Sequence, residues 1–354
     1  MKKHLLLATV IVVCAFSLCL VHAQEWNVSD ILDSMGKLPD GLGLLPQMRI
    51  PADNPQTSRK VELGRELFFE KDLSGDRSMS CSTCHDPGKG FSDGQPLAIG
   101  SHGKKLARHS PTVLNTAYNV SQFWDGRAAS LEEQAKGPIM SAGEMNLDGE
   151  AELLKRLEAS PHYQKEFEAV FGGRPTLNSA AKAIASYERT LVTRNSRFDQ
   201  YVSGNKKALT QHEKQGLALF IGKAQCSQCH NGPNFSDSKF HNLGAAGAND
   251  SGRYAITKDP ADLGSFKTPG LRNIVTHAPY MHDGSLSTLE QVIDYYDRGG
   301  NDTTNKSKLI FKLGLTQQEK SDLLSFLASL TGEVPSGPTI HARAKSIVGA
   351  TDRK

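Results

Sequence analysis

The sequence has no cysteine to spare for disulfide bonds. Of its six cysteines, two lie in an apolar N-terminal run and four form two Cys-x-x-Cys-His segments. An exported domain stabilised by disulfides would need paired thiols of its own. This scarcity argues against a disulfide scaffold and favours thioether attachment of a cofactor to the four remaining thiols.

The sequence also lacks an apolar run long enough for a membrane-spanning helix, which needs about 20 apolar residues. Its longest apolar run extends from Leu5 to Leu20 and follows two lysines. A short run of this kind is typical of a signal peptide. We therefore expect residues 1–23 to be a signal peptide cleaved near Ala23, and the mature protein to be periplasmic, without stable membrane insertion.

Neither sign of charge is in large excess. The 41 Lys and Arg residues face 38 Asp and Glu residues, and the predicted signal peptide holds two of the lysines behind the formal net charge of +3. Nucleic-acid-binding domains usually have a strongly basic surface, so we expect no nucleic-acid partner. The length of 354 residues exceeds that of most single domains and favours two domains.

Strand patterns of convincing length are missing as well, and helix signals take their place. Four Ser or Thr residues are each followed three residues later by Glu, which is the pattern of a capping box. They are Ser130, Thr210, Ser287 and Thr316. Long connections rich in Gly and Pro separate the helical stretches. The pattern predicts a mostly α fold with long loops.

The two Cys-x-x-Cys-His segments are the strongest chemical signal in the sequence. They consist of Cys81, Cys84 and His85, and of Cys226, Cys229 and His230. This spacing is typical of c-type haem attachment, in which the thiols bond to the porphyrin and the histidine ligates the iron. A zinc site would need four clustered ligands, and neither pair has a second pair nearby. We therefore predict two covalently bound haem c groups.

The same flanking sequences surround both haem segments. A helix-like stretch ending in Leu-Phe precedes each segment, at residues 63–68 and 215–220. A Phe-Ser-Asp sequence follows each segment, at residues 91–93 and 235–237. Two copies of one flank around one motif indicate two related haem-binding units.

The boundary between these units is expected in a polar stretch just ahead of the second copy. We predict two cytochrome c-like haem domains. The N-terminal domain, with the open haem, spans residues 24–200, and the C-terminal domain, with the electron-transfer haem, spans residues 201–335. Residues 336–354 form a tail.

Several short motifs occur in a characteristic order along the chain. They are Ser110-Pro-Thr-Val-Leu-Asn115, Phe123-Trp-Asp-Gly-Arg-Ala128, Leu131-Glu-Glu-Gln-Ala135, Gly143-Glu-Met145, Leu271-Arg-Asn273 and Ala278-Pro-Tyr-Met-His-Asp-Gly284. In order and spacing they resemble the bacterial di-haem cytochrome c peroxidase and MauG family. The resemblance extends from about Leu63 to Gly332.

The resemblance implies roles for three residues near the first haem. Trp124 matches the tryptophan that lies between the two haems and relays electrons. Gln134 and Glu144 match the polar pair over the open face of the N-terminal haem, where a carboxylate moves a proton between the two oxygens of hydrogen peroxide. Without the resemblance, the three residues read as a core aromatic, an exposed helix residue and a loop acid.

For the second haem, the resemblance places the remaining axial ligand at Tyr296. Simple peroxidases of the family have Met there, and MauG-like members have Tyr. The periodicity of residues 289–296 also turns Tyr296 inward and Tyr295 outward. A core tyrosine explains the same pattern, and Met281 is the competing ligand. A phenolate would favour oxidised iron and lower the haem potential relative to Met.

Two further matches concern ligands outside the haem segments. His102 is the nearest match, one residue out of register, to a histidine that ligates the first iron in the inactive state of some members. The family also binds Ca²⁺ between its domains, through two carbonyls at the positions of His277 and Pro279 and an Asn at the position of His109. An imidazole is a poor Ca²⁺ ligand, which argues against calcium here.

The function implied is a di-haem peroxidase that reduces hydrogen peroxide at the N-terminal haem with electrons passed through the C-terminal haem. The donor would be a small cytochrome c or a cupredoxin. In the MauG-like branch, a protein substrate would instead be oxidised at Trp or Tyr residues. The resemblance also allows a homodimer. The alternative, a di-haem electron-transfer cytochrome without peroxide chemistry, leaves the spacing of Trp124, Gln134 and Glu144 unexplained.

Overall fold

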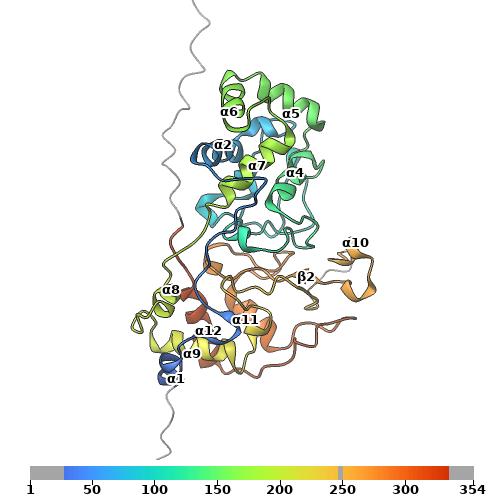
Figure 1. Cartoon of the computed structure of the whole chain (residues 1–354). Helices are drawn as coiled ribbons and strands as arrows, with labels where there is room; N and C mark the ends of the chain where they lie inside the picture. Colours follow the sequence, from blue (N-terminus) through green and yellow to red (C-terminus); the bar gives the residue numbers. More distant parts are fainter. Residues whose placement is uncertain (1–27, 246–249, 335–354) are drawn as a thin grey trace, which may run out of the picture.

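The computed structural model describes residues 28–245 and 250–334. Helices dominate this part of the chain, and its sheet is a single antiparallel pair of two-residue strands, β1 (Phe240–His241) and β2 (Phe266–Lys267). Figure 1 shows two halves, one above the other, with β2 near their junction. The predominance of helix confirms the mostly α prediction. The predicted signal peptide and tail lie outside the described residues.

The elements of the upper half follow one another along the chain. They are the helices α2 (Ser58–Phe69), α3 (Cys81–Cys84), α4 (Leu131–Met140), α5 (Gly149–Glu158), α6 (Pro161–Phe171) and α7 (Leu177–Glu188), with short 3-10 turns at Lys71–Leu73, Pro87–Lys89, Ser101–Gly103 and Thr116–Tyr118.

The lower half contains the remaining helices and both strands. The helices are α1 (Val28–Ser34), α8 (Arg197–Val202), α9 (Gln211–Ile221), α10 (Tyr254–Thr257), α11 (Leu289–Asp297) and α12 (Gln317–Ser329), with 3-10 turns at Pro39–Gly41, Cys226–Gln228, Pro260–Asp262 and Ile274–Thr276. No helix in the described part of the chain is both long and apolar enough to cross a membrane.

The upper half is built around the contact between α2 and α7. Leu67 and Phe68 of α2 are fully buried in this core. Gly64 allows the two helices to approach closely, because a methyl group at this position would lie 1.8 Å from the carbonyl oxygen of Ala183. Only glycine permits such an approach without moving the backbone.

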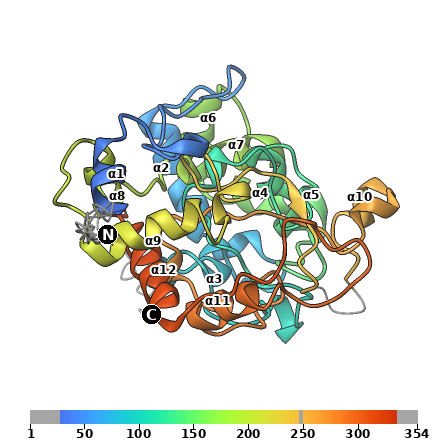
Figure 2. The same cartoon turned by 90° about the horizontal axis from the view of Figure 1, so that it is seen from below.

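The lower half repeats this arrangement with α9 and α12, which lie side by side (Figure 2). A methyl group at Gly216 would lie 2.0 Å from the carbonyl oxygen of Asp322. Beyond this contact, Phe220, Phe235 and Phe326 pack with ring centroids 5.2–6.2 Å apart. The repeated Leu-Phe flank is therefore a helix-packing sequence in both halves.

The beginning of the described chain, up to Leu42, does not pack with the half that follows it in sequence. Leu32 and Leu42 are buried in the core of the lower half. Asp33 accepts a hydrogen bond from the Tyr201 hydroxyl at 2.9 Å and pairs with the Lys214 ammonium at 2.7 Å. Residues up to Leu42 of the predicted N-terminal domain therefore share the core of the lower half, whereas Asn54, just before α2, bonds to Glu132 and to the carbonyl oxygen of Lys182 in the upper half.

Two of the four predicted capping boxes form, and two differ. The boxes that form are those at Thr210 and Thr316. Ser130 caps α4, but the reciprocal bond goes to the residue before it. The box predicted at Ser287 is wrong by one residue, because Thr288 is the cap and Gln291 its partner. The Gln291 side chain accepts from the backbone N–H groups of both Ser287 and Thr288. The sequence alone does not separate the two positions, because each is a Ser or Thr followed three residues later by Glu or Gln.

Arg272, from the Leu-Arg-Asn motif, joins three segments of the lower half. Its guanidinium is buried and pairs with Asp199 at 2.8 Å. It also donates to the carbonyl oxygens of Pro233 at 2.8 Å and Gly43 at 2.9 Å. The motif therefore has a structural role, because Arg272 joins the segment at Gly43 to α8 and to the loop at Pro233.

Replacement of this guanidinium should destabilise the protein strongly. Breaking a buried ion pair by removing one partner typically costs about 3–5 kcal/mol. We expect R272M to lower the free energy of unfolding by about this amount in denaturant titrations. The matched control is R59M, because the Arg59 pair with Glu166 is exposed and screened by water, so its loss should lower the free energy of unfolding much less. Equal stabilities of the two variants would contradict the role of Arg272.

Candidate functional site

Each half contains a cavity, and the two cavities meet at the junction. The first cavity is lined by Cys81, Cys84, His85, Gln134, Pro138 and Glu144. The second is lined by Cys226, Cys229, His230, Met281 and Tyr296. Trp124 and His282 line both cavities. The sequence-predicted residues thus gather around two adjoining spaces.

The first Cys-x-x-Cys-His segment is held by local backbone geometry. Its cysteines begin and end the single turn of α3, and the Ser110 hydroxyl donates to the carbonyl oxygen of Cys84 at 2.8 Å. The next loop returns so that the carbonyl oxygen of Phe91 lies 3.2 Å from Nδ1 of His85. This contact fixes the imidazole and leaves Nε2 directed elsewhere.

The second segment repeats the arrangement. The carbonyl oxygen of Phe235 lies 3.0 Å from Nδ1 of His230. Phe235 has a φ of +54°, and Phe91 has a φ of +57°, so the two loops share an uncommon backbone conformation. The Phe-Ser-Asp repeat in the sequence therefore corresponds to a loop that orients the histidine.

The two cysteines and the histidine of each Cys-x-x-Cys-His segment fit a c-type haem. A metal-bound histidine usually donates its other ring N–H to a carbonyl or carboxylate, as the two Nδ1 contacts allow. None of the four segment cysteines forms a disulfide. Burial raises the pKa of the Cys226 thiol to about 12 and that of Cys229 to about 11, so these thiols stay protonated without a bonding partner.

Glu144 and Gln134 both line the first cavity. Burial raises the pKa of Glu144, and the Arg127 guanidinium offsets part of this effect. The backbone N–H of Met145 donates to the carbonyl oxygen of Pro138 at 3.1 Å, which places Glu144 beside that proline. A carboxyl group with a raised pKa can exchange protons near neutral pH more readily than an exposed one.

The internal duplication aligns Pro138 with Tyr296. Each is the eighth residue of its helix, α4 and α11, and each helix follows a loop with two positive φ angles. These angles occur at Phe123 and Gly126 in one loop and at the corresponding Met281 and Gly284 in the other. The first cavity therefore has a proline where the second has a phenol.

Trp124 corresponds to His282 in the same alignment. The Trp124 indole donates from Nε1 to the carbonyl oxygen of His109 at 2.9 Å, and its own carbonyl oxygen accepts from the N–H of Lys267 at 2.8 Å. The ring centroids of Trp124 and His282 are 6.4 Å apart. The indole is thus held by a bond within the upper half, and the backbone of Trp124 is bonded to the lower half.

The two adjacent tyrosines of α11 differ from the sequence-based expectation in one respect. Tyr296 lines the second cavity, and burial raises the pKa of its phenol. Tyr295, expected to face outward, is only 3% exposed, and its hydroxyl donates to the carbonyl oxygen of Leu243 at 2.7 Å. The outward prediction was wrong because the loop containing Leu243 covers that side of the helix.

His102 lies outside both cavities, whereas the positions predicted to bind calcium border them. His102 has an exposed side chain next to Asp76 and does not contribute to the lining of the first cavity. His277 and Pro279 line the second cavity, and burial lowers the pKa of His277 to about 4. The third position, His109, presents imidazole nitrogens, one of them 2.8 Å from the carbonyl oxygen of Gln95. This set is a poor fit for Ca²⁺, which prefers oxygen ligands.

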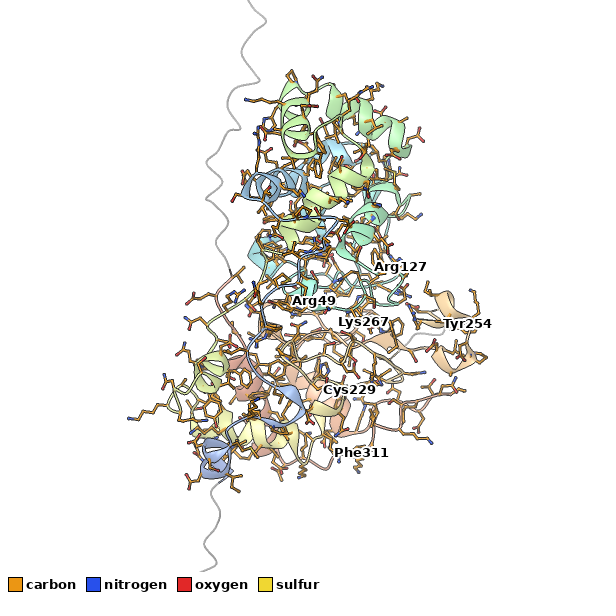
Figure 3. All side chains as sticks on the ribbon, in the orientation of Figure 1. Arg49, Arg127, Cys229, Tyr254, Lys267 and Phe311 are labelled. Atoms are coloured by element: carbon orange, nitrogen blue, oxygen red, sulfur yellow. The ribbon has the colours of Figure 1, made fainter. Side chains whose placement is uncertain are left out.

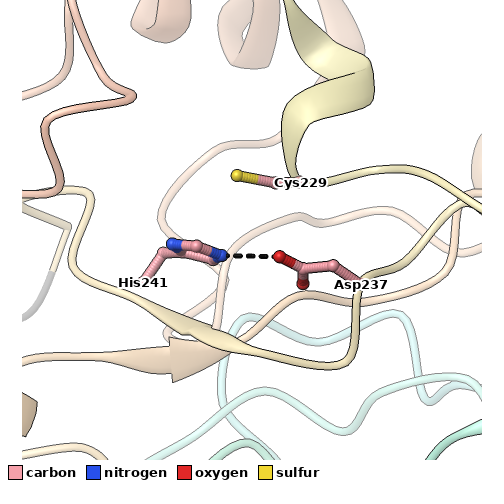
Figure 4. Close-up of side chains that lie close together, drawn as sticks. All are labelled: Cys229, Asp237 and His241. Carbon is pink, nitrogen blue, oxygen red and sulfur yellow. Dashed lines mark hydrogen bonds and ion pairs between the residues drawn. The ribbon is translucent and has the colours of Figure 1, made fainter. Parts of the chain in front are cut away.

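The structure also shows two groupings of side chains that the sequence motifs did not predict. Asp237 accepts from His241 at 2.9 Å, with Cys229 beside them (Figure 4). These three donors could hold a metal only where the Cys229 sulfur is not bonded to haem. Glu188 lines the first cavity near Cys81, and burial raises its pKa to about 8. No short motif marks Glu188 or His241, so only their contacts and burial reveal them.

Known proteins share this organisation over most of its length. A family model described as di-haem cytochrome c peroxidase matches residues 58–207. Cytochrome-c peroxidase IdrP1 of Pseudomonas sp. (strain SCT) is 42% identical over 335 residues, which cover 85% of this chain and 87% of the relative. Methylamine utilization protein MauG of Methylorubrum extorquens is 40% identical over 287 residues, covering 80% and 81% of the two chains.

A solved structure gives the same result at the level of the fold. The crystal structure of a MauG-like protein associated with microbial copper homeostasis has a TM-score of 0.77 and 36% identity, and the match covers 84% of this chain and 96% of that one. The chain therefore belongs to the di-haem cytochrome c peroxidase family, whose members are peroxidase-type oxidoreductases that carry two c-type haems.

Proposed function

We propose that the two halves are two haem domains and that hydrogen peroxide reacts in the first cavity. Cys81, Cys84 and His85 would hold the first haem, and Cys226, Cys229 and His230 the second. The observation that carries the proposal is the difference between Pro138 and Tyr296. A proline side chain has no nitrogen, oxygen or sulfur atom to ligate a metal, so the first haem keeps a face for peroxide.

The first haem, held by Cys81, Cys84 and His85, would supply an iron able to bind peroxide and to store its oxidising equivalents. Glu144 takes a proton from one peroxide oxygen and delivers it to the other, which departs as water. Gln134 orients the oxygens from the same side of the cavity. The buried position of Glu144 suits this exchange, because its raised pKa lets the carboxyl group both accept and donate a proton.

Trp124 is proposed to connect the two cavities. Its indole lines both cavities, and its hydrogen bond to the carbonyl oxygen of His109 holds the ring in one orientation. An aromatic ring fixed in this place shortens the gap that an electron has to cross between the haems. Two electrons delivered this way, with two protons, convert one peroxide to two waters.

The second haem would be closed by Tyr296 and would store charge. Burial raises the pKa of this phenol, so the phenolate forms only where a nearby positive charge stabilises it. A ferric iron in the second cavity would supply that charge. This ligand favours the MauG-like branch, in which Trp or Tyr residues of a partner protein are oxidised. In the simple peroxidase branch, a small cytochrome c or a cupredoxin would supply the electrons.

The optical and electron paramagnetic resonance spectra of the ferric protein test the proposal. We expect one high-spin and one low-spin haem, and the high-spin signal should disappear when a slight excess of peroxide is added. Loss of this signal measures access to the first cavity. Two low-spin haems that do not react with peroxide would contradict the proposal and support an electron-transfer cytochrome.

A further inference from the structure

Lys267 is a buried cation without an anionic partner in the described part of the chain. It lies on β2 at the junction of the two halves (Figure 3), is 8% exposed and lines the second cavity. Within residues 28–245 and 250–334, its ammonium makes no hydrogen bond or ion pair, and the intervening residues 246–249 include no charged side chain.

Such an arrangement is unfavourable unless an anion is supplied from elsewhere. Burial alone lowers the pKa of Lys267, to about 8, with no neighbouring charge to oppose it. Arg108, at the same junction, shows the contrast, because its guanidinium pairs with Asp125 at 2.7 Å and Asp250 at 2.8 Å. The missing anion for Lys267 is therefore not one of the described side chains.

We propose that Lys267 binds a propionate carboxylate of the haem in the second cavity. The inference rests on the proposed assignment of that cavity to a haem, whose two propionates are its anionic groups. Since the N–H of Lys267 is bonded to the carbonyl oxygen of Trp124, this contact would direct the propionate edge of the porphyrin toward Trp124. Lys267 is thus a positioning residue for the path between the haems.

The contact predicts an electrostatic effect that packing alone would not produce. A buried positive charge near the porphyrin disfavours the oxidised iron, which carries one more positive charge than the reduced iron. At a fixed applied potential, K267M should therefore lower the reduced-to-oxidised ratio of the second haem at least tenfold. This corresponds to 59 mV for a one-electron couple. K267R keeps the charge and should stay close to the wild type.

The experiment is a redox titration of the holoprotein followed by the low-spin signal of the second haem. The control is K258M, which removes an exposed lysine at the end of α10, outside the lining of the second cavity, where water screens the charge, and should shift the ratio much less. Equal ratios in K267M, K267R and the wild type would overturn the inference.

A crystal structure of the wild-type holoprotein gives a second test that needs no variant. A propionate oxygen within 3.5 Å of Lys267 Nζ supports the inference. A haem with both propionates more than 4 Å from that atom overturns it and leaves the proposed function intact. An absent second haem would instead contradict the assignment of the cavity.

Discussion

The variant E144Q is expected to oxidise reductants with peroxide about 10²- to 10⁴-fold more slowly than the wild type, which is the usual loss when a general acid–base group is removed. Gln keeps the size and polarity of the side chain but cannot exchange a proton. Glu144 lines the first cavity close to Pro138, on the side that we propose stays open for peroxide. The measurement is the rate of peroxide-driven oxidation in rapid mixing.

The matched control is E188Q, which alters another carboxyl group of the first cavity, one that is buried. Glu188 lies near Cys81, on the side of haem attachment, and we expect its replacement to leave the rate within a few-fold of the wild type. If E188Q were slow and E144Q fast, the proton exchange would belong to Glu188. Unchanged rates in both variants would exclude these two carboxyl groups from the step.

The pH dependence of the wild type gives a further check on Glu144. Its pKa is raised above the ordinary value of 4.5, so the basic form is lost as the pH falls through the raised value. The acid limb of the rate profile should therefore lie above pH 4.5 and be missing in E144Q. The sign for stability is opposite: a raised carboxyl pKa means that the contribution of Glu144 to stability decreases as the pH rises through this window.

The sequence predicts the parts of this site that are local in the chain. The two Cys-x-x-Cys-His segments and their Phe-Ser-Asp loops are complete within about 15 residues, since His85 is oriented by Phe91 and His230 by Phe235. Helix caps at Thr210 and Thr316 are equally local. Motif and structure agree here because the interacting groups are close in sequence.

The burial of residues that pack against distant segments could not be predicted from the sequence. Tyr295 is covered by the loop at Leu243, which lies far from it in sequence. Leu32 packs in the core of the second half across the whole first half of the chain. Lys267 reads as an ordinary polar strand residue until the junction of the halves buries it. Tertiary contacts, not local pattern, decide these positions.

The second large effect concerns the iron of the second haem. In Y296F the phenol oxygen is lost, and we expect the low-spin signal of this haem to be replaced by a high-spin signal. Loss of an anionic ligand should also raise its midpoint potential by on the order of 100 mV, within the ~0.8 V range that axial ligands span. Resonance Raman spectra and a redox titration measure the two changes.

The decisive comparison is with M281L, because Met281 lines the same cavity. Met281 occupies the loop position that corresponds to Phe123 in the first half, whereas Tyr296 occupies the helix position that corresponds to Pro138. If the helix position faces the iron in both halves, Y296F changes the spectrum and M281L does not. The reverse result would make Met281 the ligand, raise the expected potential of the wild-type haem and favour simple peroxide reduction over oxidation of a protein partner.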